Sequence, residues 1–313
     1  MTIPVIFAFD ENYALPASVA IRSLVETKSA ETDYEIVVLH GGLNRRIMRR
    51  METVAPIRWV KVDRHRFVDY PKGWSGEATW YRLLLGELLP EYDRVIWSDV
   101  DVLFRRDLSS VFTLELGDAD WAGVPEEKNS DGSMTFIPSL MVVPTKRWRE
   151  MCFFYKCEEL IHREREQLTM YDLDVLNRLA KRILPLSPDW CVFERLPSER
   201  SHAPEYGRMA AVHGQVGLDQ AISDPSILHY AGPPIKVWLR SLSEMPSEYR
   251  KAVVRSPFWD PDREKVGIRS FAKLVWHLLA YVATRNIAHR RMVGIYRRTL
   301  SHFRAGSHTG ESI

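Results

Sequence analysis

Residues 94–104, Arg-Val-Ile-Trp-Ser-Asp-Val-Asp-Val-Leu-Phe, carry the pattern on which the predicted fold depends. The apolar run 94–97 predicts a buried strand, and two carboxylates, Asp99 and Asp101, follow it directly. Ligands of open α/β sheets bind beyond the carboxyl ends of the strands. This stretch therefore predicts the ligand-binding edge of a sheet.

Strands and helices are predicted to alternate on both sides of this segment. Short apolar runs predict strands, and apolar residues at helical spacing predict helices. On the N-terminal side we expect strands at 3–9, 35–39 and 57–62, and helices at 15–24, 44–54 and 77–89. On the C-terminal side we expect a strand at 139–143, helices at 146–165 and 172–181, an irregular stretch at 183–206 and a strand at 226–230. This order predicts an α/β fold with right-handed crossovers and a mostly parallel sheet flanked by helices.

The composition is that of a globular protein. The chain has 313 residues, of which 45% are hydrophobic and 27% charged, and its net charge is +2. These values exclude wholesale disorder, a collagen-like repeat and a small disulfide-stapled fold. The three cysteines, an odd number with no Cys-x-x-Cys pair, predict reduced thiols in a cytoplasmic protein. No basic segment opens the chain and no apolar run reaches about 18 residues, so neither a secretory signal nor a membrane span is expected.

The charge is divided unevenly along the chain. Residues 265–313 hold nine Lys or Arg and one acid, about +8, which leaves about −6 for residues 1–264. We therefore expect a catalytic domain at 1–256 and a basic amphipathic helical tail at 257–313. The tail contains an apolar run of about 13 residues at 271–283, too short to span a bilayer but long enough to lie in its interface.

The tail is predicted to dock on an anionic membrane. Its arginines supply the attraction, and its Trp276 and Tyr281 suit the headgroup region. The alternatives are a helix packed on the domain with solvated arginines, and a nucleic-acid arm. The acidic body and the apolar content of the tail speak against nucleic acid. The expected location is therefore cytoplasmic and peripheral, on the inner face of the cytoplasmic membrane.

The Asp-x-Asp pattern occurs four times in the chain, so the pattern alone is weak. The other pairs have the positions 118/120, 172/174 and 260/262, and solvated turn acids are the ordinary explanation for each. Only Asp99 and Asp101 follow a buried strand. Their hard oxygen ligands suit Mn²⁺ or Mg²⁺, and such an ion neutralises a diphosphate.

The segment 227–238 offers further groups for the same ligand. His229 at a strand end can supply an imidazole to the cation, Gly232 lets backbone approach a phosphate, and Lys236 can supply a counter-charge. The alternative is a hydrogen-bonded core histidine and a surface lysine.

The segment 7–14 suits a nucleobase and its ribose. Ala8 is small, Asp10 and Asn12 can form hydrogen bonds, and Tyr13 offers an aromatic face. The alternative is a helix cap formed by Asp10 or Asn12 beside a packed tyrosine.

Five segments in fixed order resemble one family, the retaining glycosyltransferases of family 8. Its members include bacterial lipopolysaccharide galactosyl- and glucosyltransferases and glycogenin. The segments are FAFDENYA (7–14), ATWYRLLLGELLP (78–90), RVIWSDVDVLF (94–104), DLDVLN (172–177) and HYAGPPIKVW (229–238). The similarity covers about residues 3–240. It implies a GT-A fold, a UDP-sugar donor and a Mn²⁺-type cation between the diphosphate and the paired carboxylates.

The resemblance also implies roles for individual residues. The implied metal ligands are Asp99, Asp101 and His229, and the implied uridine-binding residues are Ala8, Asp10, Asn12 and Tyr13. The implied sugar- and diphosphate-binding residues are Arg82, Asp172, Gly232 and Lys236. Asp172 and Asp174 are the nucleophile candidates, although a same-face mechanism with the departing phosphate as base needs no protein nucleophile.

Two departures from the family pattern fall where the donor sugar is expected. Residues 137–139 are Ile-Pro-Ser where the family often has Asn-Ala-Gly, and Leu173 replaces a glutamine. The phosphate loop has one extra residue, and Val237 stands where proline is usual. These changes leave the implied metal and UDP contacts intact. They predict a more apolar sugar pocket, with either a deoxy or otherwise altered donor sugar or a hexose bound in a different orientation.

The expected reaction is transfer of a hexose from a UDP-sugar to an acceptor hydroxyl, with retention. A glycan, lipid-linked or lipopolysaccharide-type acceptor is expected, and the cation and Lys236 are expected to stabilise the leaving UDP. One alternative is a non-catalytic UDP-sugar-binding protein of the same fold. Another is a sugar nucleotidyltransferase, which the absence of any glycine before Gly41 opposes.

Overall fold

The computed structural model of the protein describes residues 1–71, 76–231 and 236–261. Two predictions fall partly or wholly outside these residues. Gly232 is one of them, and the basic tail beyond residue 261 is the other. Both stay predictions, as does the domain boundary at residue 256.

Two compact units divide the chain. The first comprises residues 1–231 and 247–259, and the second comprises residues 232–246 and 260–313. The described part of the second unit contains two short 3-10 helices, η7 (Val237–Leu239) and η8 (Leu242–Glu244). A capping box at Ser241 and Glu244 defines the start of η8.

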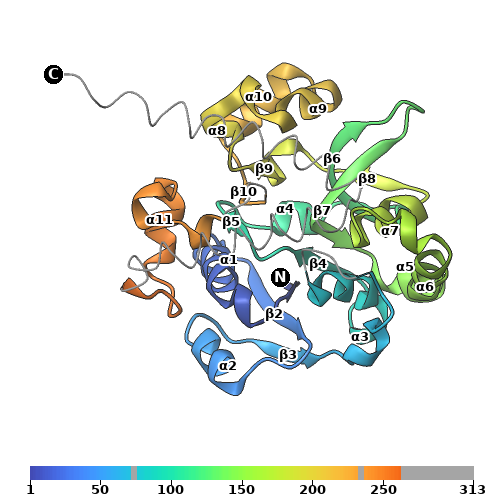
Figure 1. Cartoon of the computed structure of the whole chain (residues 1–313), viewed down its shortest axis with the longest axis horizontal. Coiled ribbons are helices and arrows are strands. Elements are labelled where there is room, and N and C mark those ends of the chain that lie inside the picture. The colour runs from blue at the N-terminus through green and yellow to red at the C-terminus, as the bar shows by residue number, and fades with distance from the viewer. Residues whose placement is uncertain (72–75, 232–235, 262–313) are drawn as a thin grey trace. The chain divides into compact units, whose positions relative to one another are not determined.

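A seven-stranded sheet forms the centre of the first unit (Figure 1), in the order β3-β2-β1-β4-β7-β6-β8. The strands β1, β2, β3 and β4 are mutually parallel, β7 runs antiparallel to β4 and β6, and β8 is parallel to β6. The bounds are β1 (Thr2–Ala8), β2 (Asp33–His40), β3 (Arg58–Lys61), β4 (Val95–Ser98), β6 (Trp121–Lys128), β7 (Met134–Val143) and β8 (Ile183–Pro185). The predicted mostly parallel α/β sheet is therefore confirmed.

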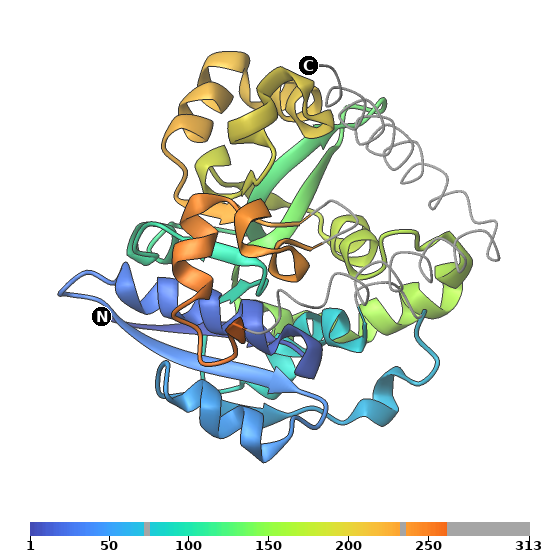
Figure 2. The same cartoon turned by 60° about the vertical axis from the view of Figure 1, so that its left-hand side comes forward.

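Helices cover both faces of this sheet, because the central strands are apolar on both sides. On one face lie η3 (Glu77–Leu84), α3 (Leu85–Leu88), α5 (Thr145–Glu150), α6 (Phe153–Glu164) and α7 (Asp172–Leu179), which share a buried cluster with strand residues such as Ile6 and Trp97. Figure 2 shows the helices α1 (Ala14–Glu26) and α11 (Ser247–Val253) together on the other side. Ser18 and Ser256 share a buried hydrogen bond of 2.5 Å there.

A second, three-stranded sheet contains the strand that ends at His229. Its order is β5-β10-β9, with β10 (Ile227–His229) antiparallel to β5 (Val102–Phe104) and parallel to β9 (Val192–Phe193). The strand predicted at 226–230 is confirmed as β10. The two partner strands were not predicted, and β9 lies within the stretch expected to be irregular.

Other elements connect the sheets or continue from them. The remaining helices are η1 (Glu11–Tyr13), α2 (Arg45–Glu52), η2 (Arg64–Phe67), α4 (Ser109–Phe112), η4 (Arg165–Gln167), η5 (Pro188–Trp190), α8 (Leu196–Glu199), η6 (Arg200–His202), α9 (Pro204–His213) and α10 (Gln215–Ser223). Within the described residues, the helices are all too short or too polar to traverse a lipid bilayer.

One predicted helix is broken. The helix expected at 146–165 is two helices, α5 and α6, because Cys152 between them adopts a left-handed conformation with φ 51° and ψ 47°. The helix expected at 77–89 begins as the 3-10 helix η3 and becomes α-helical only in α3.

Candidate functional site

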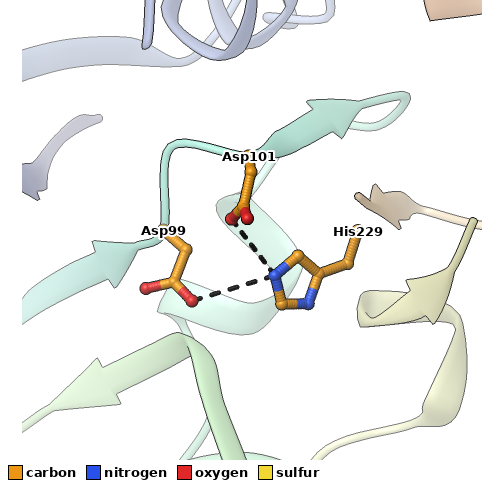
Figure 3. A group of neighbouring side chains, drawn as sticks. All are labelled: Asp99, Asp101 and His229. Carbon is orange, nitrogen blue, oxygen red and sulfur yellow. Dashed lines mark hydrogen bonds and ion pairs between the residues drawn. The ribbon is translucent and has the colours of Figure 1, made fainter. Parts of the chain in front are cut away.

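Asp99, Asp101 and His229 converge in the first unit (Figure 3). Nε2 of His229 lies 3.3 Å from Oδ1 of Asp101 and 3.9 Å from Oδ2 of Asp99. One ligand atom from each residue lies within 4.8 Å of the other two. His229 and Asp101 are buried, and Asp99 is half-buried. Two carboxylates from one segment and an imidazole from a segment about 130 residues later thus lie close together.

Pairing of the strands creates this convergence. The two acids occupy the connection between β4 and β5, and β10 pairs with β5 so that His229 stands opposite Val102. Two backbone hydrogen bonds fix the connection. The N–H of Asp99 donates to the Ser139 carbonyl at 2.7 Å, and the N–H of Tyr230 donates to the Asp101 carbonyl at 2.7 Å.

The three side chains fit a divalent cation. Two carboxylates and one imidazole form a donor set that suits Mn²⁺ and related ions. Burial opposes a charge on His229, but the neighbouring Cys191 sulfur and Asp101 carboxylate outweigh it and raise the pKa of His229 to about 10. The imidazole thus offsets the negative charge of the acids when no cation does.

Arg82 on η3 joins this triad to a second acid, Asp172. Its NH2 lies 2.9 Å from Oδ1 of Asp99, and its Nε lies 3.0 Å from Oδ2 of Asp172. Its NH1 donates to the Pro138 carbonyl at 2.6 Å, and the guanidinium lies over the Trp97 ring, 4.7 Å from the ring centroid. The buried arginine therefore has each of its nitrogens engaged by a neighbour.

Asp172 is a buried carboxylate whose charge is supported locally. Burial raises the pKa of Asp172, and the Arg82 guanidinium and the Thr79 hydroxyl oppose that rise. The Thr79 hydroxyl donates to Oδ1 of Asp172 at 2.5 Å. Asp172 therefore faces the same arginine that holds Asp99.

Asp174, the other predicted nucleophile candidate, is engaged elsewhere. Its carboxylate accepts a hydrogen bond from the N–H of Met170 at 2.7 Å, in the turn that precedes α7. The intervening Tyr171 has φ 53° and ψ −117°, a conformation that favours glycine. This turn directs the two acids of the pair to different neighbours.

The predicted uridine-binding segment follows β1 at the carboxyl edge of the sheet. Ile6 of β1 stands opposite Trp97 of β4, so Ala8 at the end of β1 shares an edge with the residues after β4. Asp10 is exposed, and its carboxylate accepts from the Asn12 N–H at 2.9 Å. This bond caps η1, the local role that was the alternative for Asp10. Asn12 is exposed and Tyr13 is half-buried.

The predicted diphosphate-binding residues belong to the second unit. Lys236 directly precedes η7, and its Nζ lies 5.5 Å from the Trp238 ring centroid. Gly232 lies outside the described residues.

Sequence reasoning missed the residues that support the triad. Trp97 donates its indole N–H to Oδ1 of Asp99 at 3.3 Å, and the Cys191 sulfur lies 3.4 Å from Nδ1 of His229. Trp97 ends the apolar run that predicted β4, so its position carried a usable signal. Cys191 had none, because it lies in a stretch without recognisable periodicity.

Comparison with known proteins places this arrangement in a family. The profile described as "Glycosyl transferase family 8" matches residues 4–241. "Glycosyltransferase GlyF" of Streptococcus pneumoniae serotype 4 is 23% identical over 180 residues, which cover 55% of this chain and 44% of that protein. A "Putative glycosyltransferase" of Haemophilus influenzae is 21% identical over 197 residues, 58% of this chain and 60% of that one. The chain thus matches about half the length of these curated relatives.

Solved structures of low sequence identity share the fold. The galactosyltransferase LgtC, in a complex with donor and acceptor sugar analogs, superposes with a TM-score of 0.68 at 21% identity, covering 84% of this chain and 99% of that one. This likeness agrees with the GT-A architecture of the sheet. The profile match over most of its length shows that the chain belongs to glycosyltransferase family 8.

Proposed function

We propose that this protein is a retaining glycosyltransferase that moves a hexose from a UDP-sugar to an acceptor hydroxyl. The observation that carries the proposal is the convergence of Asp99, Asp101 and His229, with Arg82 joining Asp99 to Asp172. Family membership makes a nucleotide-sugar donor the expected substrate class. The fold neighbour LgtC, crystallised with donor and acceptor sugar analogs, supports the same reading.

Asp99, Asp101 and His229 are the residues proposed to hold the cation, as Mn²⁺ or Mg²⁺. When bound, such an ion neutralises the charge of a diphosphate leaving group. The protein contributes two carboxylates and an imidazole on fixed backbone, so their orientation is set before the donor arrives. Lys236 and Gly232 are proposed to contact the diphosphate.

The sugar is proposed to bind between Arg82 and Asp172. A carboxylate accepts hydrogen bonds from sugar hydroxyls and a guanidinium donates them, and both groups here are buried and mutually oriented. Ala8, Asp10, Asn12 and Tyr13 are proposed to hold uridine at the adjoining edge of the sheet. Asp172 is the acid proposed to face the reacting sugar, with Asp174 a candidate of the same pair.

The acceptor is proposed to be a glycan or a lipid-linked, lipopolysaccharide-type molecule at the inner face of the cytoplasmic membrane. The support is the basic tail, which carries about +8 of charge beyond residue 264. A protein drawn to an anionic surface meets lipid-linked acceptors there. The tail lies outside the described residues beyond residue 261, so this part rests on the sequence.

UDP release in the presence of Mn²⁺, a panel of UDP-sugars and glycan acceptors tests the proposal. Asp101→Asn should lower the rate at least about 100-fold, because metal stabilisation of charge is worth several kcal/mol. Asp118→Asn is the matched control, since it alters another Asp-x-Asp pair whose acid is exposed and paired with Arg182. Its rate should equal that of the wild type.

Two outcomes would contradict the proposal. Equal rates for Asp101→Asn and the wild type would remove the metal site from the reaction. Tight UDP binding with no turnover of any sugar would instead favour the non-catalytic binding protein, which the apolar Leu173 beside Asp172 makes the strongest competing function.

A further inference from the structure

Cys191 and Ser139 form a buried polar chain behind the metal-binding triad. The Ser139 hydroxyl donates to the Cys191 sulfur at 3.3 Å, and that sulfur lies 3.4 Å from Nδ1 of His229. All three residues are at most 3% exposed. Water therefore cannot readily replace either of these two contacts, and each polar group depends on its protein partner.

Strand pairing sets the position of the sulfur. Cys191 immediately precedes β9, which pairs with β10 so that Phe193 stands opposite His229. The Phe193 and His229 rings are stacked, with centroids 5.5 Å apart and an interplanar angle of 22°. The Phe193 ring fixes the plane of the imidazole, and the Cys191 sulfur contacts Nδ1 of that imidazole.

The same chain reaches a second ligand of the triad. The backbone carbonyl of Ser139 accepts from the N–H of Asp99 at 2.7 Å, while its hydroxyl bonds to Cys191. One residue thus supports Asp99 through its backbone and His229 through its side chain. Ser139 belongs to the Ile-Pro-Ser segment that departs from the family pattern, and no part of the proposed reaction uses its hydroxyl.

We infer that Cys191, held by Ser139, is a positioning residue for the metal ligand His229. A histidine binds a metal through a nitrogen that carries no proton, and its other nitrogen then carries one and needs an acceptor. In this protein Nε2 faces the two acids, so Nδ1–H donates to the Cys191 sulfur. This bond selects the tautomer and the ring rotation that present the lone pair of Nε2 to a cation.

The inference rests on the proposed metal-dependent function, and calorimetric titration of the full-length, reduced protein with Mn²⁺ tests it. Cys191→Ala removes the acceptor and should weaken Mn²⁺ binding about 10- to 100-fold. Cys191→Ser restores an oxygen acceptor and should bind Mn²⁺ clearly more tightly than Cys191→Ala. Ser139→Ala leaves the sulfur in place with one bond fewer, so we expect an intermediate loss.

Cys157→Ala is the matched control, because it removes a fully buried sulfur from a core cluster that contains none of the three proposed metal ligands. It should lower the melting temperature and leave Mn²⁺ affinity unchanged. UDP affinity measured in a chelator should be the same in all variants, since a merely structural loss would lower it as well. These readouts separate positioning of His229 from general damage to the fold.

Equal Mn²⁺ affinity in the wild type and Cys191→Ala would overturn the inference, and so would a wild type that binds no Mn²⁺. If Cys191→Ala does not fold, unchanged affinity in Ser139→Ala overturns it instead. No sugar enters these titrations. A failure of the proposed transferase reaction, read from UDP release, is therefore distinguishable from a failure of this inference.

Discussion

Arg82 is the residue that holds two acids of the candidate site in one arrangement. Separate nitrogens of its guanidinium contact Asp99 and Asp172, and a third donates to the Pro138 carbonyl. A lysine keeps the charge but presents one compact ammonium in place of a planar fork. Arginine at this position is thus explained by geometry as well as by charge.

We predict that Arg82→Met lowers the free energy of unfolding by about 3–5 kcal/mol, because it leaves buried Asp172 without its charged partner. Arg82→Lys should cost less, since the charge remains. Urea denaturation followed by circular dichroism measures both. Arg163→Met is the control, because Arg163 pairs with Glu164 at the surface, and its loss should stay within about 1 kcal/mol. Equal losses in the free energy of unfolding at the two positions would show that the buried ion pair stabilises the fold no more than the surface pair does.

Replacement of Asp172 and replacement of Asp174 should have different effects on activity and stability. Asp174→Ala removes the acceptor of the Met170 N–H and should cost about 1 kcal/mol of stability, typical of one hydrogen bond, with little change in kcat. Asp172→Asn keeps the shape of the side chain but removes the charge facing Arg82, so we expect a large loss of kcat and a small change in melting temperature. Steady-state kinetics and thermal unfolding of the two variants measure this. If Asp174→Ala lowered kcat as much as Asp172→Asn does, the prediction would be wrong and Asp174 would take part in the reaction.

For single residues, the sequence predicted the members of the candidate site better than it predicted the neighbouring residues that position them. Asp99 and Asp101 follow a recognisable strand, and a rule about strand ends selects them. Cys191 reaches His229 only because β9 and β10 pair across 38 residues of chain, which no local pattern encodes. The contact between Asp10 and Asn12 is local, and the alternative given for it anticipated that contact.

Among the elements, the loop between α1 and β2 is tied to the start of α4 by one carboxylate, Asp107. It accepts hydrogen bonds from the Ser29 N–H at 3.0 Å, the Thr32 hydroxyl at 3.2 Å, the Tyr34 hydroxyl at 3.0 Å and the Ser109 N–H at 2.7 Å. Burial alone raises the pKa of Asp107, but the hydrogen bonds from these donors outweigh it and lower that pKa to about 2.

Asp107→Asn should therefore destabilise the protein in a pH-dependent way. A folded-state pKa below the unfolded value means that the charged carboxylate stabilises the fold above about pH 4 and that this contribution is lost as the pH falls toward 2. At pH 7 we expect a loss of about 1–3 kcal/mol, typical of hydrogen bonds to a charged group. Urea denaturation of both proteins between pH 2.5 and 7 measures the difference, with Asp118→Asn as control. A difference that does not shrink on acidification would assign the effect to packing.

Elements with strong periodicity were predicted, and those that depend on distant pairing were not. The runs at 3–9 and 35–39 are confirmed as β1 and β2 because buried parallel strands are apolar throughout. Strands β5 and β9 have three and two residues, too few for any pattern. The break at Cys152 escaped notice because a non-glycine residue in the left-handed region leaves no mark in the sequence.

At the scale of the whole molecule, cationic groups lie on the body as well as on the tail. Helix α2 exposes Arg45, Arg46, Arg49 and Arg50 along its outer side, while the net charge of residues 1–264 is about −6. A membrane-binding experiment must therefore distinguish the helix from the tail. Removal of the tail and neutralisation of α2 are independent changes that do this.

We predict that the basic tail directs this protein to anionic membranes. Full-length protein should co-sediment with phosphatidylglycerol vesicles at low salt and be released at high salt, since each basic residue near the surface contributes about 1 kcal/mol that salt screens. A truncated protein ending at Gly267 should stay in the supernatant. The full-length triple variant Arg45→Gln/Arg46→Gln/Arg49→Gln should still sediment, because the tail retains its charge of about +8.

Each other pattern of sedimentation assigns the interaction differently. Equal sedimentation of the full-length and truncated proteins would contradict the role of the tail. Loss of binding in the triple variant alone would transfer that role to α2. Salt-independent sedimentation would show that the apolar run 271–283 dominates over the arginines. Transfer to a water-soluble acceptor should be equally fast in the full-length and truncated proteins, because every candidate site residue, from Ala8 to Lys236, precedes the truncation at Gly267.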